Sequence, residues 1–519
     1  MNIGMLLDMA AEGFGDRIVV GRKGVGDAEL KVSARMDEGL SARRLRELAA
    51  GGAHLARASA ADAILYLAVN GPALPVALFA AARAGVPLVP VNYRLGEAQL
   101  DALLANHPRA LGIADAEHAG ALRRAGLPVC SPSEWLAQAA ENTGHPVDDE
   151  PVQTDAPAAL IYTSGTTSAP KGVVLRHRNL VSYVLGTVEF AAADPDEAAL
   201  VSVPPYHIAA VSNVLTNLYA GRRALTLEQF TPDGWLGLVR QERITNAMVV
   251  PTMLARIMDT DGLDRSVPTL RTLAYGGARM PVRVIEAALR EWPHVDFVNA
   301  YGLTETSSTI TVLGPEEHRT AVASDDPVVR ARLGSAGLAV PGIELEVRDP
   351  VGAVVAAGVS GQIWVRGEQV SGEYAGGGPV VDERGFFHTR DQGHVDADGY
   401  LHIEGRADDT IIRGAENIAP AEIEDVLLRH PDVLDAVVVG VPDEEWGQRI
   451  EAVVVLREGV AVDADDLRAQ VRGTLRGSRT PERIACWPEL PRTPTGKLVR
   501  RDVVEALTAE RRQAVGRQG

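Results

Sequence analysis

The chain has 519 residues, more than a single hydrophobic core usually holds, so we expect at least two domains. Its 69 acidic residues outnumber its 51 basic ones, and the formal net charge of −18 argues against nucleic acid or anionic lipid as a partner. Two cysteines, Cys130 and Cys486, exclude a disulfide framework, and neither belongs to a metal-ligand cluster. The start, Met1 to Asp8, lacks the basic region and long apolar core of a signal peptide, which favours a cytoplasmic protein.

The first recognisable elements form a β-α-β unit. One uncharged window is long enough for a membrane helix, but Gly71 and Pro72 break it. A buried strand at 63–69, a turn, a helix ending near Gly85 and a strand at 86–91 explain the window better. This order predicts a parallel sheet covered by helices and no integral membrane segment.

The alternation of strands and helices returns further along the chain. Strands are expected at 198–203, 223–227 and 246–250, and helices at 212–219, at 235–242 and from Pro251 onward. From about Gly334 the pattern changes to short strands punctuated by glycine, at 342–347 and 361–366. That change predicts an antiparallel or β-barrel-like subdomain. The glycine-rich segment 372–379 is expected to be a surface loop, with a position beside a ligand as the alternative.

A smaller unit follows Asp408. A helix at 420–429, strands at 435–441 and 449–456, and a helix at 464–475 predict a compact α+β domain. The fold class is therefore α/β. We expect a large N-terminal domain, residues 1–405, of parallel-sheet α/β subdomains plus the β-barrel-like subdomain, and a small mobile C-terminal domain, residues 406–519.

The segment from Thr163 to Gly172, Thr-Ser-Gly-Thr-Thr-Ser-Ala-Pro-Lys-Gly, has the composition of a phosphate-binding loop. Small residues let backbone amides approach phosphate oxygens, the hydroxyl groups add donors, and Lys171 adds a positive charge. The loop is not a Walker motif, because five residues separate Gly165 from Lys171 and the lysine precedes a glycine. Such a loop by itself is more often a simple linker.

Four further motifs decide between these two interpretations. They are Asn299-Ala300-Tyr301-Gly302-Leu303-Thr304-Glu305-Thr306, His388-Thr389-Arg390-Asp391-Gln392-Gly393, Gly405-Arg406-Ala407-Asp408-Asp409 and Pro494-Thr495-Gly496-Lys497. In this order the set resembles the adenylate-forming (ANL) superfamily, which contains acyl-CoA synthetases, peptide-synthetase adenylation domains and luciferases. The resemblance runs from about Asn92 to Lys497. It implies an ATP-dependent, AMP-forming carboxylic acid–CoA ligase similar to the fatty-acyl-CoA synthetases.

The resemblance implies ATP, Mg²⁺ and coenzyme A as cofactors and assigns residues to the nucleotide. The phosphates would contact Thr163, Ser164, Gly165, Thr166, Thr167 and Lys171; the adenine would lie among Gly276, Gly277, Ala278, Asn299, Tyr301 and Gly302; and Asp391 and Arg406 would hold the rest of the nucleotide. A carboxylate such as Asp391 can accept hydrogen bonds from both ribose hydroxyls. For residues 275–278 a tight strand-to-helix turn explains the glycines equally well.

The expected catalytic residues are Thr304, Glu305, His207 and Lys497. Attack of a carboxylate on the α-phosphorus expels pyrophosphate, so negative charge builds up on the phosphates and must be neutralised. Glu305 is a suitable Mg²⁺ ligand, and Thr304 beside it can bond the α-phosphate. In the family, a lysine at the position of Lys497 bridges the carboxylate and the α-phosphate, and a histidine like His207 lies near the acyl carboxylate, although His207 also fits a buried structural histidine.

The second half-reaction needs a thiol. Gly414, Glu416 and Asn417 match the segment that lines the pantetheine tunnel in acyl-CoA synthetases, after the small domain rotates about Asp408. Ser168, Arg390 and Ala415 stand where the family usually has glycine, which leaves open a catalytically weak acyl- or nucleotide-binding homologue.

The acid is expected to be apolar. Small or aliphatic residues surround the position of His207, namely Val211, Val214, Leu215, Val249, Val250 and Ala300, with Asn213 among them. No Asp or Lys is placed to anchor a second charged group, so a small-molecule monocarboxylic acid such as a medium or long fatty acid is favoured. A stand-alone adenylating enzyme that loads a carrier protein is the alternative, and a homodimer is compatible with the sequence.

Overall fold

The computed structural model describes residues 1–22, 39–144, 153–163, 171–413, 416–443, 446–475, 477–493 and 498–516. Its largest sheet has nine strands in the order β15-β14-β13-β12-β11-β9-β10-β1-β2. They are β1 (Ile18–Val20), β2 (Leu40–Ser41), β9 (Ala198–Val201), β10 (Arg223–Thr226), β11 (Asn246–Val249), β12 (Thr272–Gly276), β13 (Asp296–Leu303), β14 (Ser308–Leu313) and β15 (Leu338–Ala339). The central strands are parallel, and β2, β14 and β15 add antiparallel edges.

The second sheet has eight strands in the order β19-β18-β8-β7-β4-β3-β5-β6. They are β3 (Ile64–Leu67), β4 (Leu88–Pro90), β5 (Leu111–Ala114), β6 (Val129–Cys130), β7 (Pro157–Thr163), β8 (Lys171–Arg176), β18 (Glu373–Tyr374) and β19 (Gly378–Pro379). The run from β7 to β6 is parallel, so the predicted β-α-β unit is confirmed.

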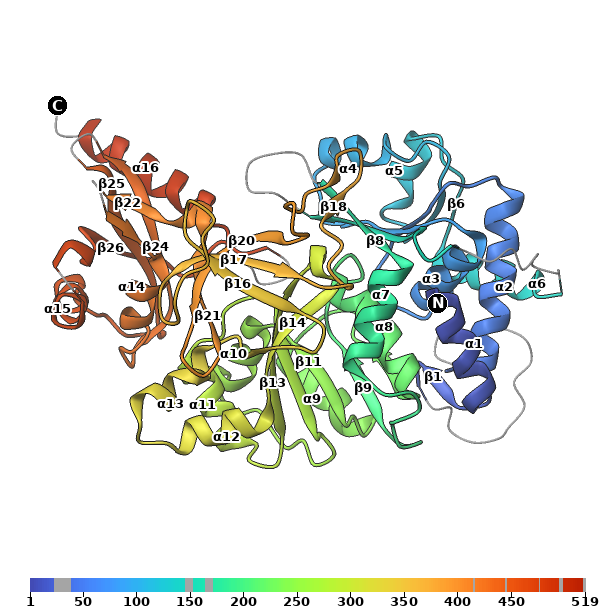
Figure 1. Cartoon of the computed structure of the whole chain (residues 1–519), viewed down its shortest axis with the longest axis horizontal. Coiled ribbons are helices and arrows are strands. Elements are labelled where there is room, and N and C mark those ends of the chain that lie inside the picture. Colours follow the sequence, from blue (N-terminus) through green and yellow to red (C-terminus); the bar gives the residue numbers. More distant parts are fainter. Residues whose placement is uncertain are drawn as a thin grey trace.

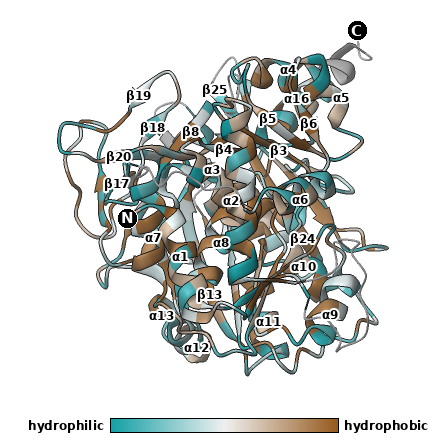
Figure 2. Cartoon of the chain, turned by 90° about the vertical axis from the view of Figure 1, so that its right-hand side faces the viewer, coloured by the Kyte–Doolittle hydropathy of each residue, from teal (hydrophilic) through white to brown (hydrophobic). Residues whose placement is uncertain are grey.

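Helices cover the sheets on the faces that the strand patterns leave apolar. One apolar core gathers α1 (Ile3–Phe14), α2 (Ala42–Ala58), α3 (Ala73–Ala84), α6 (Pro132–Glu141), α7 (His177–Thr187) and α8 (Ile208–Ala220). Figure 2 shows α1, α2 and α8 beside one another. Every residue of α3 from Ala73 to Ala82 is buried, which explains the uncharged window. Among the described residues, no helix has the length and apolar character to cross a membrane.

Separate apolar clusters cover the remaining faces. In the second sheet, α4 (Glu97–Leu104) and α5 (Ala119–Arg124) pack against β3 and β5. Against the first sheet pack the helices α9 (Pro232–Gln241), α10 (Pro251–Asp259) and α11 (Val282–Glu291). The helices α12 (Pro315–Ala323) and α13 (Pro327–Ala331) come after β14 in the chain. Cys130 is buried, Cys486 is exposed, and both are free thiols.

The glycine-punctuated region forms a four-stranded antiparallel sheet in the order β16-β17-β20-β21. Its strands are β16 (Glu344–Arg348), β17 (Gly361–Arg366), β20 (Phe387–Val395) and β21 (Leu401–Arg406). The segment 372–379 was expected to be a surface loop; residues 375–377 are an exposed turn, as expected, but the segment as a whole is not a loop. It folds into the β18–β19 hairpin and extends the second large sheet, because Tyr374 pairs with Val173 of β8.

The 3₁₀ turn η3 (Ala407–Asp409) leads into a small α+β unit at one end of the molecule, orange and red at the left of Figure 1. It contains β22 (Ile411–Arg413), β23 (Glu416–Ile418), α14 (Pro420–Leu427), β24 (Val433–Asp443), β25 (Gly447–Leu456), α15 (Ala464–Thr474), β26 (Arg483–Cys486) and α16 (Arg500–Gly516). The strands β24, β25 and β26 form its sheet, and two apolar clusters fill its interior. A large α/β domain and a small C-terminal domain were therefore predicted correctly.

Candidate active site

Three of the predicted nucleotide-binding residues meet at one buried carboxylate. Asp391, on β20, is only 6% exposed. Its Oδ2 accepts a 2.6 Å hydrogen bond from the Tyr301 hydroxyl, and its Oδ1 lies 3.1 Å from Nε of Arg406. The register of β20 and β21 places Asp391 opposite Arg406, and β13 supplies Tyr301. Burial and the neighbouring Asp391 carboxylate hold the pKa of Tyr301 well above its usual value, so the phenol stays a donor.

Arg390 shows why glycine is usual immediately before this aspartate. Its φ is 63°, in the left-handed region that side chains rarely adopt. The chain therefore keeps the glycine-like backbone with an arginine, at a cost of roughly 1–2 kcal/mol. The substitution does not displace Asp391 from its two partners.

Two glycines expected near the adenine allow close backbone packing. A Cβ on Gly302 would lie 1.7 Å from the carbonyl oxygen of Ser308, and one on Gly276 would lie 2.2 Å from that of Ala300. Gly277 has a φ of 83° and begins the turn from β12 towards α11. The strand-to-helix turn is thus confirmed, whereas contact of Gly276, Gly277 and Ala278 with adenine stays a prediction.

Asn299 is committed to the fold at its amide nitrogen. Its Nδ2 donates a 2.8 Å hydrogen bond to the carbonyl oxygen of Ser335. This bond ties β13 to the turn that precedes β15, next to Tyr301 on the same strand. The side chain therefore supports the position of β13, and its predicted contact with the nucleotide is not tested by this geometry.

Thr304 and Glu305 lie in the 3₁₀ turn η1 (Thr304–Thr306), which ends in an unusual backbone. Ser307 and Ser308 both have positive φ, 58° and 112°. Buried Gln369 braces the turn, since its Nε2 donates to the carbonyl oxygens of Thr306 at 3.2 Å and of Thr309 at 2.7 Å. Strained backbone held by several buried bonds is common at functional sites.

Tyr374 connects the two groups expected to hold phosphate and metal. Its hydroxyl donates a 2.8 Å hydrogen bond to Oε1 of Glu305, and Nζ of Lys171 lies 5.6 Å from the centre of its ring. Burial first, and then Glu305, raise the pKa of the Tyr374 phenol. Sequence reasoning did not single out Tyr374. The alternative of a ligand-adjacent position for 372–379 was the signal that could have found it.

The hairpin that carries Tyr374 is fixed on β8. Glu373 accepts hydrogen bonds from Nε and Nη2 of Arg176 at 2.9 and 2.8 Å, a bidentate pair. The amide of Ala375 donates to the carbonyl oxygen of Gly172 at 2.8 Å. These contacts make Tyr374 a rigid link between Glu305 and the end of the phosphate loop.

The residues at Glu305 fit the coordination that Mg²⁺ prefers. The described residues contain no cluster of three His, Cys, Asp or Glu side chains, so an all-protein metal cage is absent from them. Magnesium is usually held by one or two carboxylates together with substrate phosphates and water. In the described part of the chain no Lys or Arg forms an ion pair with Glu305, which leaves its charge available to a cation.

The structure describes the two ends of the predicted phosphate loop, Thr163 and Lys171. Thr163 and Lys171 are directly opposite each other where β7 and β8 pair, and Oγ1 of Thr163 lies 3.4 Å from the carbonyl oxygen of Lys171. The predicted residues Ser164, Gly165, Thr166 and Thr167 lie outside the described residues, as do Gly414 and Lys497. Glu416 and Asn417 are described only as backbone of β23, which pairs with β22.

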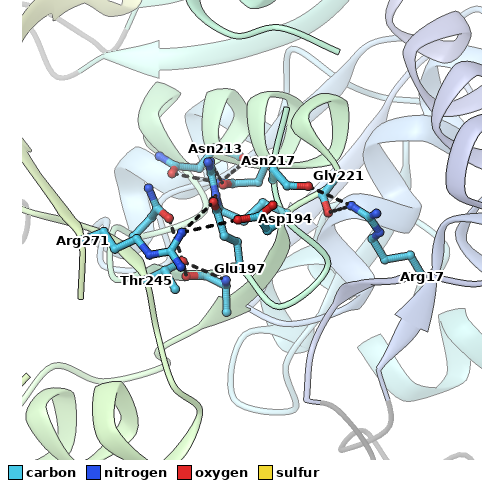
Figure 3. A network of polar contacts seen from close by, with 12 residues as sticks. Arg17, Asp194, Glu197, Asn213, Asn217, Gly221, Thr245 and Arg271 are labelled. Carbon is cyan, nitrogen blue, oxygen red and sulfur yellow. Dashed lines mark hydrogen bonds and ion pairs between the residues drawn. The ribbon is translucent and has the colours of Figure 1, made fainter. Parts of the chain in front are cut away.

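His207 caps the helix α8. Its Nδ1 accepts a 3.3 Å hydrogen bond from the amide of Ala209, in the first turn. Polar contacts along the helix hold it in place (Figure 3). Buried Asn217 donates to the carbonyl oxygen of Asn213 at 2.8 Å, and its Oδ1 accepts a 3.2 Å hydrogen bond from Arg222. These contacts lie in the middle and at the C-terminal end of α8, so they fix the helix at the end opposite to His207.

That network continues to the strands beside α8. Nε of Arg222 lies 2.9 Å from Oε2 of Glu197, and Arg271 approaches the other oxygen of Glu197 at 3.3 Å. Glu197 immediately precedes β9 and Arg271 immediately precedes β12. The contacts thus join α8 to both strands (Figure 3).

Only some of the apolar residues that were expected to surround His207 lie near it. Ala209, Ala210 and Val250 belong to one cluster, with Met248 and Met253 packed against it. Val211 and Leu215 were also expected there, but they pack into the core between the sheets, and Val249 joins the core beside α9 and α10. On the helix α8, Val211 and Leu215 point to another face than Ala209 and Ala210 do. On the strand β11, Val249 points to the opposite face from its neighbours Met248 and Val250.

Comparison with known proteins identifies the family. The model of AMP-binding enzymes matches residues 23–375, and the model of the AMP-binding enzyme C-terminal domain matches residues 422–497. Feruloyl-CoA synthase of an Amycolatopsis species is 36% identical over 470 residues, which cover 89% of this chain and 92% of that protein. A fatty acid–[acyl-carrier-protein] ligase, ScoC, of Streptomyces coeruleorubidus is 33% identical, with 85% of this chain and 86% of that protein covered.

A solved structure shares the whole architecture. ATP-bound MatB from Rhodopseudomonas palustris superposes with a TM-score of 0.83 at 26% identity, over 98% of this chain and 99% of that chain. The family models, the relatives and the shared fold agree with one another. The chain therefore belongs to the AMP-binding enzymes, the adenylate-forming superfamily of ATP-dependent acyl-CoA synthetases and ligases.

Proposed function

We propose that this enzyme joins an apolar monocarboxylic acid to coenzyme A in two steps. In the first step, a carboxylate oxygen of the acid attacks the α-phosphorus of ATP, which forms the acyl-adenylate and releases pyrophosphate. In the second step, the thiol of coenzyme A attacks the acyl carbon, which forms the thioester and releases AMP. The acid, ATP and coenzyme A are thus the three substrates.

The observation that carries this proposal is the convergence of residues distant in sequence on two carboxylates. Asp391 is bonded to Tyr301 and Arg406, and in the complex its oxygens would accept the ribose hydroxyls. Glu305, held by Tyr374, would bind Mg²⁺ together with the phosphates. Bound Mg²⁺ would supply positive charge where negative charge develops on the leaving pyrophosphate.

The remaining residues serve the attack itself. Lys171 and the loop hydroxyls would bind the departing phosphates, Thr304 the α-phosphate, and Lys497 would bridge the acid and the α-phosphate. His207, fixed at the start of α8, would lie beside the acid's carboxylate. These roles come from the matching motifs of the family.

An apolar acid is supported by the side chains beyond His207. Ala209, Ala210 and Val250 pack together with Met248 and Met253, so this surface is apolar. A second carboxylate buried against such a wall would lose hydration without gaining a partner, which costs several kcal/mol. The two relatives described above are named for ferulate and fatty acids, which both have a single carboxyl group on an apolar body.

Transfer to coenzyme A requires the small domain to move. We place its boundary between residues 405 and 406 and its hinge at Asp408, within η3. The structure contains contacts that would have to break: Arg279 forms an ion pair with Asp425 of α14, and Arg283 donates a 2.9 Å hydrogen bond to the carbonyl oxygen of Leu434 in β24. After rotation, Gly414, Glu416 and Asn417 would border the pantetheine.

A carrier-protein thiol is the second candidate acceptor, because the relative ScoC is named for one. The two acceptors are separated by one assay. Purified enzyme receives ATP, Mg²⁺ and ferulate, decanoate or succinate in turn, and pyrophosphate release is measured first. Coenzyme A or a phosphopantetheinylated carrier protein is then added, and the thioester is measured by mass spectrometry.

We expect pyrophosphate with ferulate or decanoate, little with succinate, and thioester with coenzyme A. The variant Asp391→Asn serves as the control for the nucleotide site and should lose pyrophosphate release. Thioester on the carrier protein alone would replace coenzyme A as the acceptor. Preference for succinate would overturn the assignment of an apolar acid.

A further inference from the structure

A cavity of about 190 Å³ has walls that contain none of the residues assigned to ATP or the acid. Its walls include Tyr66, Val69 and Asn70, which end and follow β3, and Asp115, which follows β5. The other large sheet contributes Thr226, the last residue of β10, and Glu228, which follows that strand. The cavity therefore lies where the carboxyl ends of strands from both sheets meet.

The order of the strands makes this position a natural ligand site. In the second sheet β3 has β4 on one side and β5 on the other, and all three are parallel. The connections after β3 and after β4 therefore lead to opposite sides of β3. In open α/β sheets, ligands bind outside the carboxyl ends of the strands at such a reversal of strand order. The candidate active site uses the other sheet for its β12 and β13 residues, so this reversal has no ligand assigned to it.

One buried polar atom in the cavity wall lacks a partner. Asn70 is 5% exposed, and its Nδ2 donates a 2.7 Å hydrogen bond to the carbonyl oxygen of Val203. Its Oδ1 has no hydrogen-bond partner among the described residues. A buried amide oxygen left unsatisfied costs about 1–3 kcal/mol, so a ligand that donates a hydrogen bond here would be favoured.

Two carboxylates border the same cavity without a cationic partner in the described part of the chain. Asp115 accepts a 2.8 Å hydrogen bond from the amide of Val69, and Glu228 is exposed at the rim. The burial of Tyr66 raises its pKa, and the next causes are these same two acids. Two acidic groups therefore contribute negative charge to the cavity.

The same cavity also carries positive charge. Arg22 lines the cavity, and its Nε lies 3.5 Å from Glu242 while its side chain is 58% exposed. Gly71, Pro72 and Ala73 place the first turn of α3 there, and no side chain caps this helix. The amino end of a helix carries a partial positive charge that favours anions.

We infer that this cavity binds a small zwitterion, with an ammonium group towards Asp115, Glu228 and Asn70 and an anionic group towards Arg22 and the start of α3. The chemistry is that of a free α-amino acid. This site is independent of the proposed ligase activity. Asn70 also connects it to the acyl end of the enzyme, because Val203 lies four residues before His207.

Binding of L-alanine to the full-length protein tests the inference, measured by isothermal titration calorimetry without ATP. Propylamine and propionate, which each carry one of the two charges, are the matched ligands. We expect L-alanine to bind saturably at one site and each single-charge ligand to bind on the order of tenfold more weakly. Absence of saturable binding of L-alanine, or equal binding of propylamine or propionate, would overturn the inference.

Variants locate the binding. Glu228→Gln and Arg22→Gln change exposed side chains and should each weaken L-alanine on the order of tenfold, whereas Glu383→Gln, an exposed carboxylate outside the cavity, should not. Because L-alanine is itself a carboxylic acid, His207→Ala is included. Binding that survives His207→Ala and weakens in the first two variants supports the cavity. Binding that is lost only in His207→Ala places the ligand in the acyl site and refutes the inference.

Discussion

The hydroxyl of Tyr374 is expected to control how well the enzyme uses Mg²⁺. It donates a 2.8 Å hydrogen bond to Oε1 of Glu305, and the ring also lies near Lys171. The variant Tyr374→Phe removes the hydrogen bond but keeps the ring. A hydrogen bond to a charged group contributes about 1.5–3 kcal/mol, and because this bond exists before Mg²⁺ binds, that energy is an upper limit; the Mg²⁺ concentration for half-maximal activity should rise several-fold and at most about 100-fold. The maximal rate at saturating Mg²⁺ should change less, since the carboxylate itself remains.

A second substitution separates the two contacts of Tyr374. The variant Tyr374→Leu also removes the ring from Lys171, whose Nζ lies 5.6 Å from the ring centre. An exposed cation–π contact contributes about 0.5–1 kcal/mol, so the affinity for ATP should be about 2- to 5-fold lower in Tyr374→Leu than in Tyr374→Phe. This extra loss is expected in ATP affinity, because Lys171 is assigned to the phosphates.

The assay is release of pyrophosphate as a function of Mg²⁺ concentration at fixed ATP and acid. Tyr162→Phe is the matched control, because its hydroxyl shares a 2.9 Å hydrogen bond with the neutral partner His107, away from Glu305. Both variants should melt within a few degrees of wild type. If the Mg²⁺ curve of Tyr374→Phe coincides with that of wild type, Tyr374 does not position a metal ligand and the reasoning fails.

Four further outcomes are expected. In the variant Gly302→Ala the new Cβ would lie 1.7 Å from a backbone oxygen, so the free energy of unfolding measured in urea should fall by at least about 3 kcal/mol. The control Gly237→Ala adds a Cβ in open space and should not destabilise the protein. Equal stability of the two variants would contradict this expectation. Burial lowers the pKa of His177 from about 6.5 in the unfolded chain to about 4 in the folded protein, so the stability that its neutral form provides above pH 6.5 is lost as the pH falls towards 4. Between pH 7 and pH 5 the free energy of unfolding should therefore fall by about 2 kcal/mol. In the variant His177→Asn, unfolding measured at both pH values should not show this loss. Arg390→Gly relieves a φ of 63°, which gains about 1–2 kcal/mol, but glycine adds unfolded-chain entropy that costs about 0.4–1 kcal/mol, so the free energy of unfolding should rise by no more than about 1 kcal/mol. Pyrophosphate release should not fall, and a large loss of activity would mean that the Arg390 side chain itself acts. Lys497→Ala should abolish adenylate formation while largely sparing thioester formation from supplied acyl-adenylate, and equal loss of both steps would remove its assigned role.

Much of the fold could be predicted because each local pattern agreed with its tertiary setting. The uncharged helix α3 is buried all round, and Gly85, with a φ of 78°, ends it where the sequence placed its end. The strands at 198–203, 223–227 and 246–250 became β9, β10 and β11 within a few residues. Periodicity and turn residues are sufficient for such elements.

The errors come from contacts that no local pattern contains. The hairpin at 372–379 is rich in glycine, which also marks loops, and it forms strands only because β8 offers an edge to pair with. Tyr374 meets Glu305 across 69 residues of sequence, so spacing could not reveal the pair. Val211 and Leu215 have suitable side chains for an acyl wall but face the core between the sheets. The sequence shows that these side chains are apolar, but the direction in which they point depends on how α8 packs against the rest of the protein.

The carboxylate of Asp391 has a consequence for how the reaction is ordered. Its partner Arg406 is the last residue of β21 and directly precedes η3, where we place the hinge. A ribose whose hydroxyls donate hydrogen bonds to Asp391 would compete with Arg406 for Oδ1 and so alter the restraint on the proposed hinge. Linkage between two such equilibria is reciprocal, so the orientation of the small domain must in turn change the affinity for nucleotide. With the proposed hinge at Asp408, release of AMP and return of the domain would be one coupled event, and slow AMP release would appear as slow domain motion.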